Sequence, residues 1–332
     1  MQPFRVLVKA NNWLGEAVLS LPAIGGIKLV KPGSSVTVLT RDNLAELYEI
    51  VEDVDEIIPY ASSIDAIRKL RKREFDACLI LPRSFKAALV PTLGRIPMRV
   101  GYAADSRSML LTIPIPRGDD TLKTHRAYYY FNLLRGFAPT PPVPRARMLV
   151  PPRAEAWVEG ALKVLPTDGR PLIALAPGSG FGGSGRWSAD RFGALGRRLA
   201  RDLGAFVAVV GDAGEAELTA EVAAKAGRHA ASFGGKTTIP QLVALLARSA
   251  LYVGNDTAVM HLADALGRPI VVIYGPTDPV ESRPFGRHHA IIRREELECS
   301  PCLKRECPLK HHDCMELIGT NEVYDACRKL LA

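Results

Sequence analysis

The sequence lacks long apolar runs, and none of its uncharged stretches approaches the roughly 18 residues that a membrane-spanning helix needs. Its N-terminus, MQPFRVLVKANNW, lacks the basic-then-apolar pattern of a secretory signal. Aromatic residues make up only 7% of the 332 positions and do not alternate with basic ones, which counts against a nucleic-acid surface. We therefore expect a soluble, cytoplasmic chain that binds no nucleic acid.

Cysteine is also scarce, and four of its six copies fall between residues 299 and 314. A cytosolic chain keeps its thiols reduced, so the pattern does not indicate a disulfide framework. The spacing instead fits a structural zinc site, and the alternative is reduced thiols packing a turn-rich connector. The candidate ligands are Cys299, Cys302, Cys307 and Cys314, with His311 and His312 nearby.

Acidic residues are outnumbered, because 43 Lys and Arg face 35 Asp and Glu and give a net charge of +8. Residues 1–150 hold 21 basic and 14 acidic side chains (+7), which leaves 22 and 21 (+1) for residues 151–332. A basic first half favours an anionic partner such as phosphate, nucleic acid or a membrane surface. Charge that serves only solubility is the alternative.

The composition supports a full core, with 47% hydrophobic and 23% charged residues. Short apolar strands alternate with helix-length segments in both halves, which predicts parallel sheets covered on both faces. Prolines crowd residues 139–152 between the halves. We predict two doubly wound, Rossmann-like α/β domains, 1–150 and 151–332, with the cleft between them as the default active site. The last helix belongs to the second domain, with packing back on the first as an option.

The expected elements follow from these patterns. Strands are predicted at 5–9, 36–40, 56–59, 77–81 and 99–101, and again at 172–176, 206–210, 251–253, 270–274 and 290–293. Helices are predicted at 17–30, 44–51 and 63–73, and again at 189–203, 216–226, 239–248, 258–266 and 321–330.

A carboxylate follows the first strand. Gly15 permits a tight turn there, and Glu16 falls at or near the first turn of the next helix. At the carboxyl end of a strand, Glu16 is well placed as a general base. An acidic residue that complements the helix dipole is the alternative, and the residues alone favour it.

The strand at 172–176 runs into a glycine-rich loop, with five glycines between Gly178 and Gly185. Such a loop lets backbone N–H groups approach a phosphate, and Arg186 could pair with one. Gly178, Gly180 and Gly183 satisfy GxGxxG, but the helix begins late and Asp212 lies 29 residues past Gly183. A phosphate loop therefore fits better than a dinucleotide loop.

The segment 251–267 predicts a strand, a cap at Asp256 or Thr257, and a helix ended by Gly267. The free N–H groups and the positive dipole at the start of that helix suit a pyrophosphate. His261 falls near the same helical face, and Tyr274–Pro279 ends the next strand in another polar turn.

Together these motifs resemble the heptosyltransferase family of lipopolysaccharide core synthesis, glycosyltransferase family 9, and its heptosyltransferase II branch most closely. The resemblance covers nearly the whole chain. It rests on Trp13–Glu16 with Leu21-Pro22, Leu81–Lys86 with Arg95–Tyr102, Pro177-Gly178 with Arg186-Trp187, Asn255–His261, Tyr274–Thr277 and Cys299–Pro308.

The resemblance implies a GT-B fold, two Rossmann-like domains facing across a cleft. It also implies inverting transfer of heptose from ADP-L-glycero-β-D-manno-heptose to a phosphorylated lipid A core, without a metal for the chemistry. The implied catalytic residues are Glu16 and Arg186. The implied donor-binding residues are Gly178, Ser179, Arg186, Trp187, Asp256, Thr257, Ala258, Met260, His261 and Gly275. The implied acceptor-binding residues are Asn12, Trp13, Arg83, Ser84, Lys86 and His125.

The acceptor would place the chain at the inner membrane's cytoplasmic face, and we expect a peripheral monomer. Basic residues of the first half could approach anionic lipid at about 1 kcal/mol each, while a solvated helix end is the alternative for 68–73. These residues are Arg68, Lys69, Arg71, Lys72 and Arg73, with Arg83, Lys86, Arg95 and Arg99.

Three positions depart from the family pattern. The family usually has Asp at the position of Glu16, a basic residue at that of Gly185 and Gly at that of Ala258. These departures leave open a non-catalytic sugar-nucleotide-binding protein or altered specificity, and a GT-B sugar-nucleotide epimerase shares the fold. A zinc-dependent nucleic-acid binder fits least, because it leaves both α/β domains unexplained.

Overall fold

A computed structural model describes residues 3–118, 123–138, 146–167 and 169–332. The chain divides into two compact units, Met1–Leu149 and Val150–Ala332, one residue from the boundary expected at 150. Of the prolines that marked this boundary, Pro151 and Pro152 begin helix α8, and those at 139–144 lie outside the described residues. None of the helices in the described ranges is both long and apolar enough to span a membrane.

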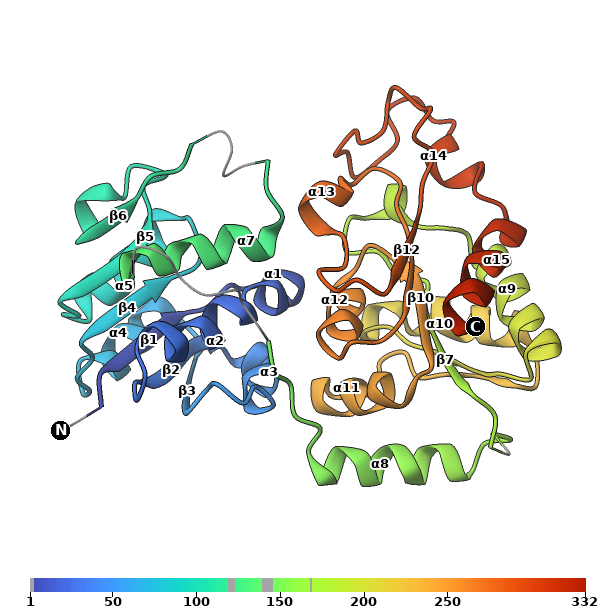
Figure 1. The fold of residues 1–332 in the computed structure, drawn as a ribbon, viewed down its shortest axis with the longest axis horizontal. Helices are drawn as coiled ribbons and strands as arrows, with labels where there is room; N and C mark the ends of the chain where they lie inside the picture. The colour runs from blue at the N-terminus through green and yellow to red at the C-terminus, as the bar shows by residue number, and fades with distance from the viewer. Residues whose placement is uncertain (1–2, 119–122, 139–145, 168) are drawn as a thin grey trace. The chain divides into compact units, whose positions relative to one another are not determined.

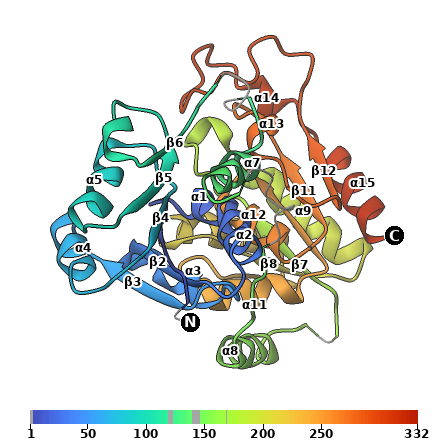
Figure 2. The ribbon, with the colours of Figure 1, turned by 60° about the vertical axis from the view of Figure 1, so that its left-hand side comes forward.

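The first unit is a six-stranded parallel sheet in the order β3-β2-β1-β4-β5-β6. Helices α4 and α5 lie on one side of this sheet and α1, α2 and α7 on the other (Figures 1 and 2). The strands are β1 Arg5–Lys9, β2 Ser35–Arg41, β3 Glu56–Tyr60, β4 Ala77–Ile80, β5 Met98–Tyr102 and β6 Ile113–Ile115. The helices are α1 Leu14–Leu19, α2 Leu21–Val30, α3 Ala45–Glu49, α4 Ser63–Leu70, α5 Phe85–Leu93 and α7 Arg126–Phe131, with short 3-10 turns η1 Asp42–Leu44, η2 Ser108–Leu110 and η3 Asn132–Gly136.

The second unit repeats this topology, with the order β12-β11-β10-β7-β8-β9. Its strands are β7 Leu172–Ala176, β8 Phe206–Val209, β9 Ala230–Ser232, β10 Leu251–Asn255, β11 Ile270–Ile273 and β12 His289–Ile292. Its helices are α8 Pro152–Lys163, α9 Ala189–Asp202, α10 Ala216–Ala226, α11 Ile239–Arg248, α12 Ala258–Ala265, α13 Pro279–Ser282, α14 Asp313–Glu316 and α15 Thr320–Leu331, with turns η4 Gly183–Gly185 and η5 Ala213–Glu215.

Both sheets are therefore doubly wound in the order of a Rossmann fold, and the predicted α/β class is confirmed. The central strands, such as β1 and β7, are buried nearly throughout because helices cover both faces, whereas the edge strands β3, β6, β9 and β12 are more exposed. In each sheet the order reverses beside the first strand, between β1 and β4 in one unit and between β7 and β10 in the other. Loops that leave the carboxyl ends of these strands are where such folds bind ligands.

The last helix, α15, packs on α9 and on strands β10, β11 and β12 of its own unit. Val323, Tyr324 and Cys327 supply its buried face. The apolar stripe of α15 therefore packs within the second unit.

Candidate functional site

Most of the predicted site residues of the first unit lie on or beside the loops that follow β1 and β4, and His125 precedes α7. Asn11 is buried, and its Nδ2 donates to the Glu16 carbonyl oxygen at 3.3 Å, which fixes the start of α1. Asn12 is exposed, and its Oδ1 accepts from the Tyr60 hydroxyl at 3.2 Å. Trp13 keeps 76% of its surface exposed. The loop therefore presents an indole ring and an amide to solvent while its neighbours hold the backbone.

A buried lysine at the end of β1 supports the loop after this strand through Tyr60. Lys9 Nζ donates to the Tyr60 hydroxyl at 2.7 Å and to the Ala10 carbonyl at 3.1 Å, and it lies 4.6 Å from the centroid of the Tyr60 ring. Burial lowers the pKa of Lys9 to about 8. The sequence pattern does not mark Lys9 as a site residue, because a charged residue at the end of a strand ordinarily reaches solvent.

Glu16 is half-buried in the first turn of α1, and its carboxylate accepts a hydrogen bond from the Tyr130 hydroxyl. The carboxylate is thus held by a side chain from α7, a helix that sequence analysis did not predict. A carboxylate that only complements the dipole of α1 needs no such bond. The bond from Tyr130 therefore also suits a carboxylate that is held in one orientation for proton transfer.

The loop after β4 carries three of the predicted acceptor residues. Arg83 and Lys86 are exposed, whereas Ser84 caps α5 by accepting from the Ala87 N–H at 3.3 Å. Arg107, which is fully buried, donates to the Pro82 and Ser84 carbonyl oxygens and holds the loop in place. His125 is buried as well, and its Nδ1 accepts from the Ala127 N–H, so its imidazole serves the start of α7.

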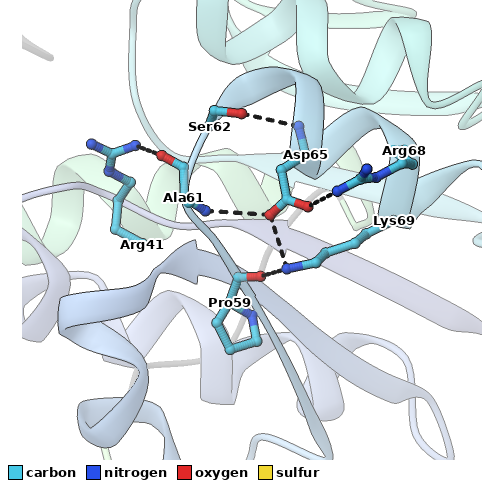
Figure 3. Close-up of polar contacts among 7 residues, drawn as sticks. All are labelled: Arg41, Pro59, Ala61, Ser62, Asp65, Arg68 and Lys69. Carbon is cyan, nitrogen blue, oxygen red and sulfur yellow. Dashed lines mark hydrogen bonds and ion pairs between the residues drawn. The ribbon is translucent and has the colours of Figure 1, made fainter.

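The basic end of α4 is already paired with acidic and carbonyl oxygens (Figure 3). The Asp65 carboxylate lies 2.9 Å from both Arg68 and Lys69, and Lys69 Nζ also donates to the Pro59 carbonyl at 2.7 Å. Hydrogen bonds from Lys69 and Arg68 lower the pKa of Asp65 to about 2. Part of the positive charge of this segment is therefore balanced within the first unit.

In the second unit, the glycine-rich loop is tied to the neighbouring strand by Asn255. This fully buried side chain donates to the carbonyl oxygens of Pro177 (3.0 Å) and Gly178 (2.9 Å) and accepts from the Trp187 N–H (3.2 Å). The loop backbone is therefore fixed at both ends. The sequence marks Asn255 only as part of a motif. Its bonds to the glycine-rich loop form because β10 lies beside β7 in the sheet.

Gly178 lies against a carboxylate. A Cβ at this position would come within 1.8 Å of Glu215 Oε1, so no residue larger than glycine fits unless Glu215 moves. Glu215 is half-buried, and burial raises the pKa of its carboxyl group. An acidic group after the second strand of a Rossmann unit is placed to bind ribose hydroxyls. The spacing of Asp212 counted against a dinucleotide loop, and in the structure the Asp212 N–H donates to Glu215 Oε2 at 3.2 Å in the capping box of η5.

Asp256 and Thr257 follow the end of β10 and lie at the start of α12. Thr257 is the N-cap residue, but its side chain makes no capping bond, and its hydroxyl lies 3.2 Å from that of Tyr252. Asp256 accepts from the Ser282 hydroxyl at 2.9 Å, and burial of its carboxylate raises the pKa to about 6. The first N–H groups of α12 therefore have no side-chain cap among the described residues.

Several predicted donor residues lie too deep to touch a ligand with their side chains. Trp187 is fully buried, with its ring edge-on to Phe192 and its indole N–H bonded to the Ile318 carbonyl at 3.0 Å. Met260 is also fully buried, and a Cβ at Gly275 would meet Met315 at 2.6 Å. The Trp187 and Met260 side chains therefore pack in the core, and Gly275 lies close against Met315, while the donor-binding role of these three residues stays a prediction. His261 is buried too, whereas Arg186 is exposed and Ser179 half-exposed.

The four clustered cysteines line one small cavity. All six cysteines of the chain are free thiols. Burial raises the pKa of Cys314 to about 11, and the charges of the other three clustered thiols add to the shift. Within the described ranges, however, no three His, Cys, Asp or Glu side chains are arranged to hold a metal ion, so zinc stays a prediction from spacing. The cavity is lined by Cys299, Cys302, Cys307, Cys314, His311, His312, Ser184, Pro276, Pro308 and Leu309.

This cysteine segment also holds the glycine-rich loop. The Ser184 hydroxyl donates to the Lys304 carbonyl at 2.6 Å, and His312 Nε2 lies 2.8 Å from the Ser184 carbonyl. The Ser300 hydroxyl donates to the Gly275 carbonyl at 2.7 Å. The segment is therefore part of the framework of both loops at this sheet edge.

Known proteins with similar sequences and structures point to one family. The sequence model described as "Glycosyltransferase family 9 (heptosyltransferase)" matches residues 64–312. Lipooligosaccharide heptosyltransferase 2 of Haemophilus ducreyi is 26% identical over 347 residues, 99% of each chain. Lipopolysaccharide heptosyltransferase 2 of Salmonella typhimurium is 28% identical over 311 residues, covering 87% of this chain and 88% of that protein.

Among solved structures, E. coli ADP-heptose lps heptosyltransferase II superposes with a TM-score of 0.83 at 25% identity, over 98% of each chain. A family 9 glycosyltransferase from Veillonella parvula reaches 0.85 at 21% identity, which shows a shared fold. Since the family model spans well over half of the sequence, the chain belongs to glycosyltransferase family 9, the heptosyltransferases.

Proposed function

We propose that this protein transfers L-glycero-D-manno-heptose from ADP-heptose to the heptosyl-Kdo2-lipid A inner core, with inversion at the anomeric carbon. The second unit binds the nucleotide sugar and the first binds the acceptor. The observation that carries the proposal is the sheet edge of the second unit, where Gly178 lies against the Glu215 carboxylate and the start of α12 has no side-chain cap.

The donor fits this edge by its chemistry. Backbone N–H groups of the Gly178–Gly185 loop and of the first turn of α12 bind the diphosphate, and Arg186 is the exposed cation nearest in sequence to the loop. Glu215 accepts hydrogen bonds from the ribose hydroxyls. Stabilising the departing ADP in this way supplies the larger part of the rate enhancement.

In the first unit, Glu16 removes the proton from the acceptor hydroxyl. The acceptor oxygen then bonds to the anomeric carbon while the bond from that carbon to ADP breaks, and ADP leaves with the electron pair. Five of the predicted acceptor residues are exposed and available to the acceptor: Asn12, Trp13, Arg83, Ser84 and Lys86. We further propose that the chemistry needs no metal ion, and that the protein acts as a monomer at the cytoplasmic face of the inner membrane.

The direct test is to incubate the protein with ADP-heptose and heptosyl-Kdo2-lipid A in the presence of EDTA. We expect release of ADP and a product heavier by one heptose unit, both measured by mass spectrometry. ADP binding without acceptor-dependent turnover would instead indicate a sugar-nucleotide-binding protein. Release of a free or epimerised sugar would indicate an epimerase.

Glu16→Gln tests the general base. The variant keeps the size of the side chain but cannot take up the proton, so we expect kcat to fall by about 10²–10⁴-fold with little change in ADP affinity. Glu74→Gln, at a carboxylate that is 83% exposed, is the matched control and should transfer heptose at the wild-type rate. Turnover of Glu16→Gln at the wild-type rate would remove Glu16 from this role.

A further inference from the structure

One oxygen of the Glu16 carboxylate is held and the other is open. Glu16 Oε2 accepts from the hydroxyl of Tyr130, a side chain 114 residues further along the chain and 5% exposed. Among the described residues, no hydrogen bond reaches Oε1. The carboxylate is thus fixed in rotation about its last bond, with one oxygen free to accept a proton.

Tyr130 is itself fixed by its surroundings. Its helix, α7, is tied to the end of β5 by the Tyr102 hydroxyl, which donates to the Tyr129 carbonyl at 2.5 Å. The rings of Tyr129 and Tyr130 meet edge-on with centroids 5.3 Å apart. The hydroxyl of Tyr130 therefore points at Glu16 before any substrate binds, as preorganised catalytic groups do.

The charges around Tyr130 make it a donor and not a base. Burial raises the pKa of Tyr130 well above its ordinary value, and the negative charge of Glu16 raises it further. Arg126, on the same helix, acts in the opposite direction, and Tyr129 adds to the rise. Tyr130 keeps its proton throughout the neutral range, so the Glu16 carboxylate always has this partner.

We propose that Tyr130 is a positioning residue for the general base, whose hydroxyl holds Glu16 Oε2 so that Oε1 receives the proton of the acceptor hydroxyl. The role rests on the proposed heptosyl transfer. In the step itself the acceptor proton ends on Oε1, and Tyr130 keeps its own proton. The length of the glutamate side chain matters here, because aspartate would withdraw the carboxylate by about 1.5 Å from this partner.

The test compares Tyr130→Phe with Tyr129→Phe, assayed with ADP-heptose and heptosyl-Kdo2-lipid A. The control is closely matched: Tyr129 is 2% exposed on the same helix, and its hydroxyl has no hydrogen-bond partner among the described residues. For Tyr130→Phe we expect kcat to fall by about 10- to 100-fold with an unchanged KM for ADP-heptose. The acidic limb of its pH profile should move to higher pH, because donation to a carboxylate favours the charged form.

A double-mutant cycle with Glu16→Asp separates positioning from packing. If the shorter side chain has already lost the bond to Tyr130, adding Tyr130→Phe to Glu16→Asp should lower kcat by less than about threefold more. Two independent packing defects would instead multiply their effects and leave the pH profile of each variant in place.

The outcomes distinguish this role from the proposed function. If the wild-type protein transfers no heptose, the proposed function fails and the role of Tyr130 fails with it. If the wild type is active and Tyr130→Phe matches Tyr129→Phe in kcat and pH profile, only the role of Tyr130 is overturned. A lower kcat with a shifted acidic limb, found in Tyr130→Phe alone, supports it.

Discussion

The loop after β1 and the glycine-rich loop after β7 are held in different ways. The side chains of Asn12 and Glu16 are held by other side chains, whereas the backbone of the glycine-rich loop is held by Asn255 and by the cysteine segment. Lys9 bonds to Tyr60, Tyr60 to Asn12, and Tyr130 to Glu16 in the first unit. In the second, Asn255 and Ser184 bond to carbonyl oxygens of adjoining loops. Both units have the same strand order, so topology does not account for this difference.

The difference matches the two chemical tasks that the proposed function assigns to the units. A diphosphate is bound by backbone N–H groups, so the second unit needs a fixed main chain and residues small enough for close approach. Proton transfer needs one side-chain atom in one place, so the first unit needs its carboxylate oriented. Under the proposed function, two copies of one topology thus differ in task through the residues at their strand ends.

The largest expected effect is on the free energy of unfolding, and it differs between the two buried asparagines at the switch points, Asn255 and Asn11. Asn255→Ala leaves two carbonyl oxygens and one N–H group buried without partners, so we expect the free energy of unfolding to fall by about 3 kcal/mol or more. Asn11→Ala removes a single bond to the Glu16 carbonyl and should cost about 1 kcal/mol. Urea unfolding measures both.

Calorimetric measurement of ADP affinity gives a second comparison of the two asparagine variants. Asn255→Ala should weaken ADP binding because the glycine-rich loop loses its support, and Asn11→Ala should leave ADP binding unchanged. Equal losses of stability, or weaker ADP binding in Asn11→Ala, would contradict the division of tasks between the units.

The next effect concerns pH and the second unit. The pKa of Asp256 is raised to about 6 by burial, so the carboxyl group contributes stability that is complete below about pH 4 and is lost as pH rises through 6. Asp256→Asn lacks this dependence. Relative to wild type, its free energy of unfolding should therefore rise between pH 4.5 and pH 8, by at most about 3 kcal/mol. Urea unfolding of both proteins across this range measures the change. A difference in unfolding free energy that stays constant with pH would show that burial does not raise the pKa of Asp256.

Much of the fold could be predicted because apolar runs mark buried parallel strands. The bounds of β1 and β7 match the prediction, whereas β6 and β9 were missed. These are three-residue edge strands, one interrupted by Pro114 and the other composed of Ala, Ala and Ser, so neither carries a strand pattern. The helix expected at 17–30 is two helices, because Pro22 lies at the start of α2 and Ser20 separates it from α1.

The site could be predicted only where its chemistry is local. The glycine-rich loop and the start of α12 are readable from adjacent residues. Tyr130 could not be found in this way, because its partner lies 114 residues away and an aromatic run on a short helix indicates only a core. Trp187 shows the converse, since a residue of a family motif can serve the core beneath a ligand loop.

The smallest expected effect tests whether the basic charge of the first unit meets a membrane. Asp65→Asn releases Arg68 and Lys69 from their shared carboxylate, and Asp202→Asn is the matched control, an exposed aspartate bonded to Arg198 and Arg201 on α9 of the second unit. Binding is measured by sedimentation with phosphatidylcholine vesicles, with and without phosphatidylglycerol.

If the end of α4 lies near lipid, Asp65→Asn should bind phosphatidylglycerol vesicles up to about fivefold more tightly, because one added positive charge near an anionic surface contributes about 1 kcal/mol. Asp202→Asn adds the same charge and should change binding less. Equal increases would mean that net charge alone governs adsorption and that the units do not differ in this respect. No increase in either variant would identify the end of α4 as a solvated helix end, in which case the positive charge of the first unit would serve the phosphates of the acceptor through Arg83 and Lys86.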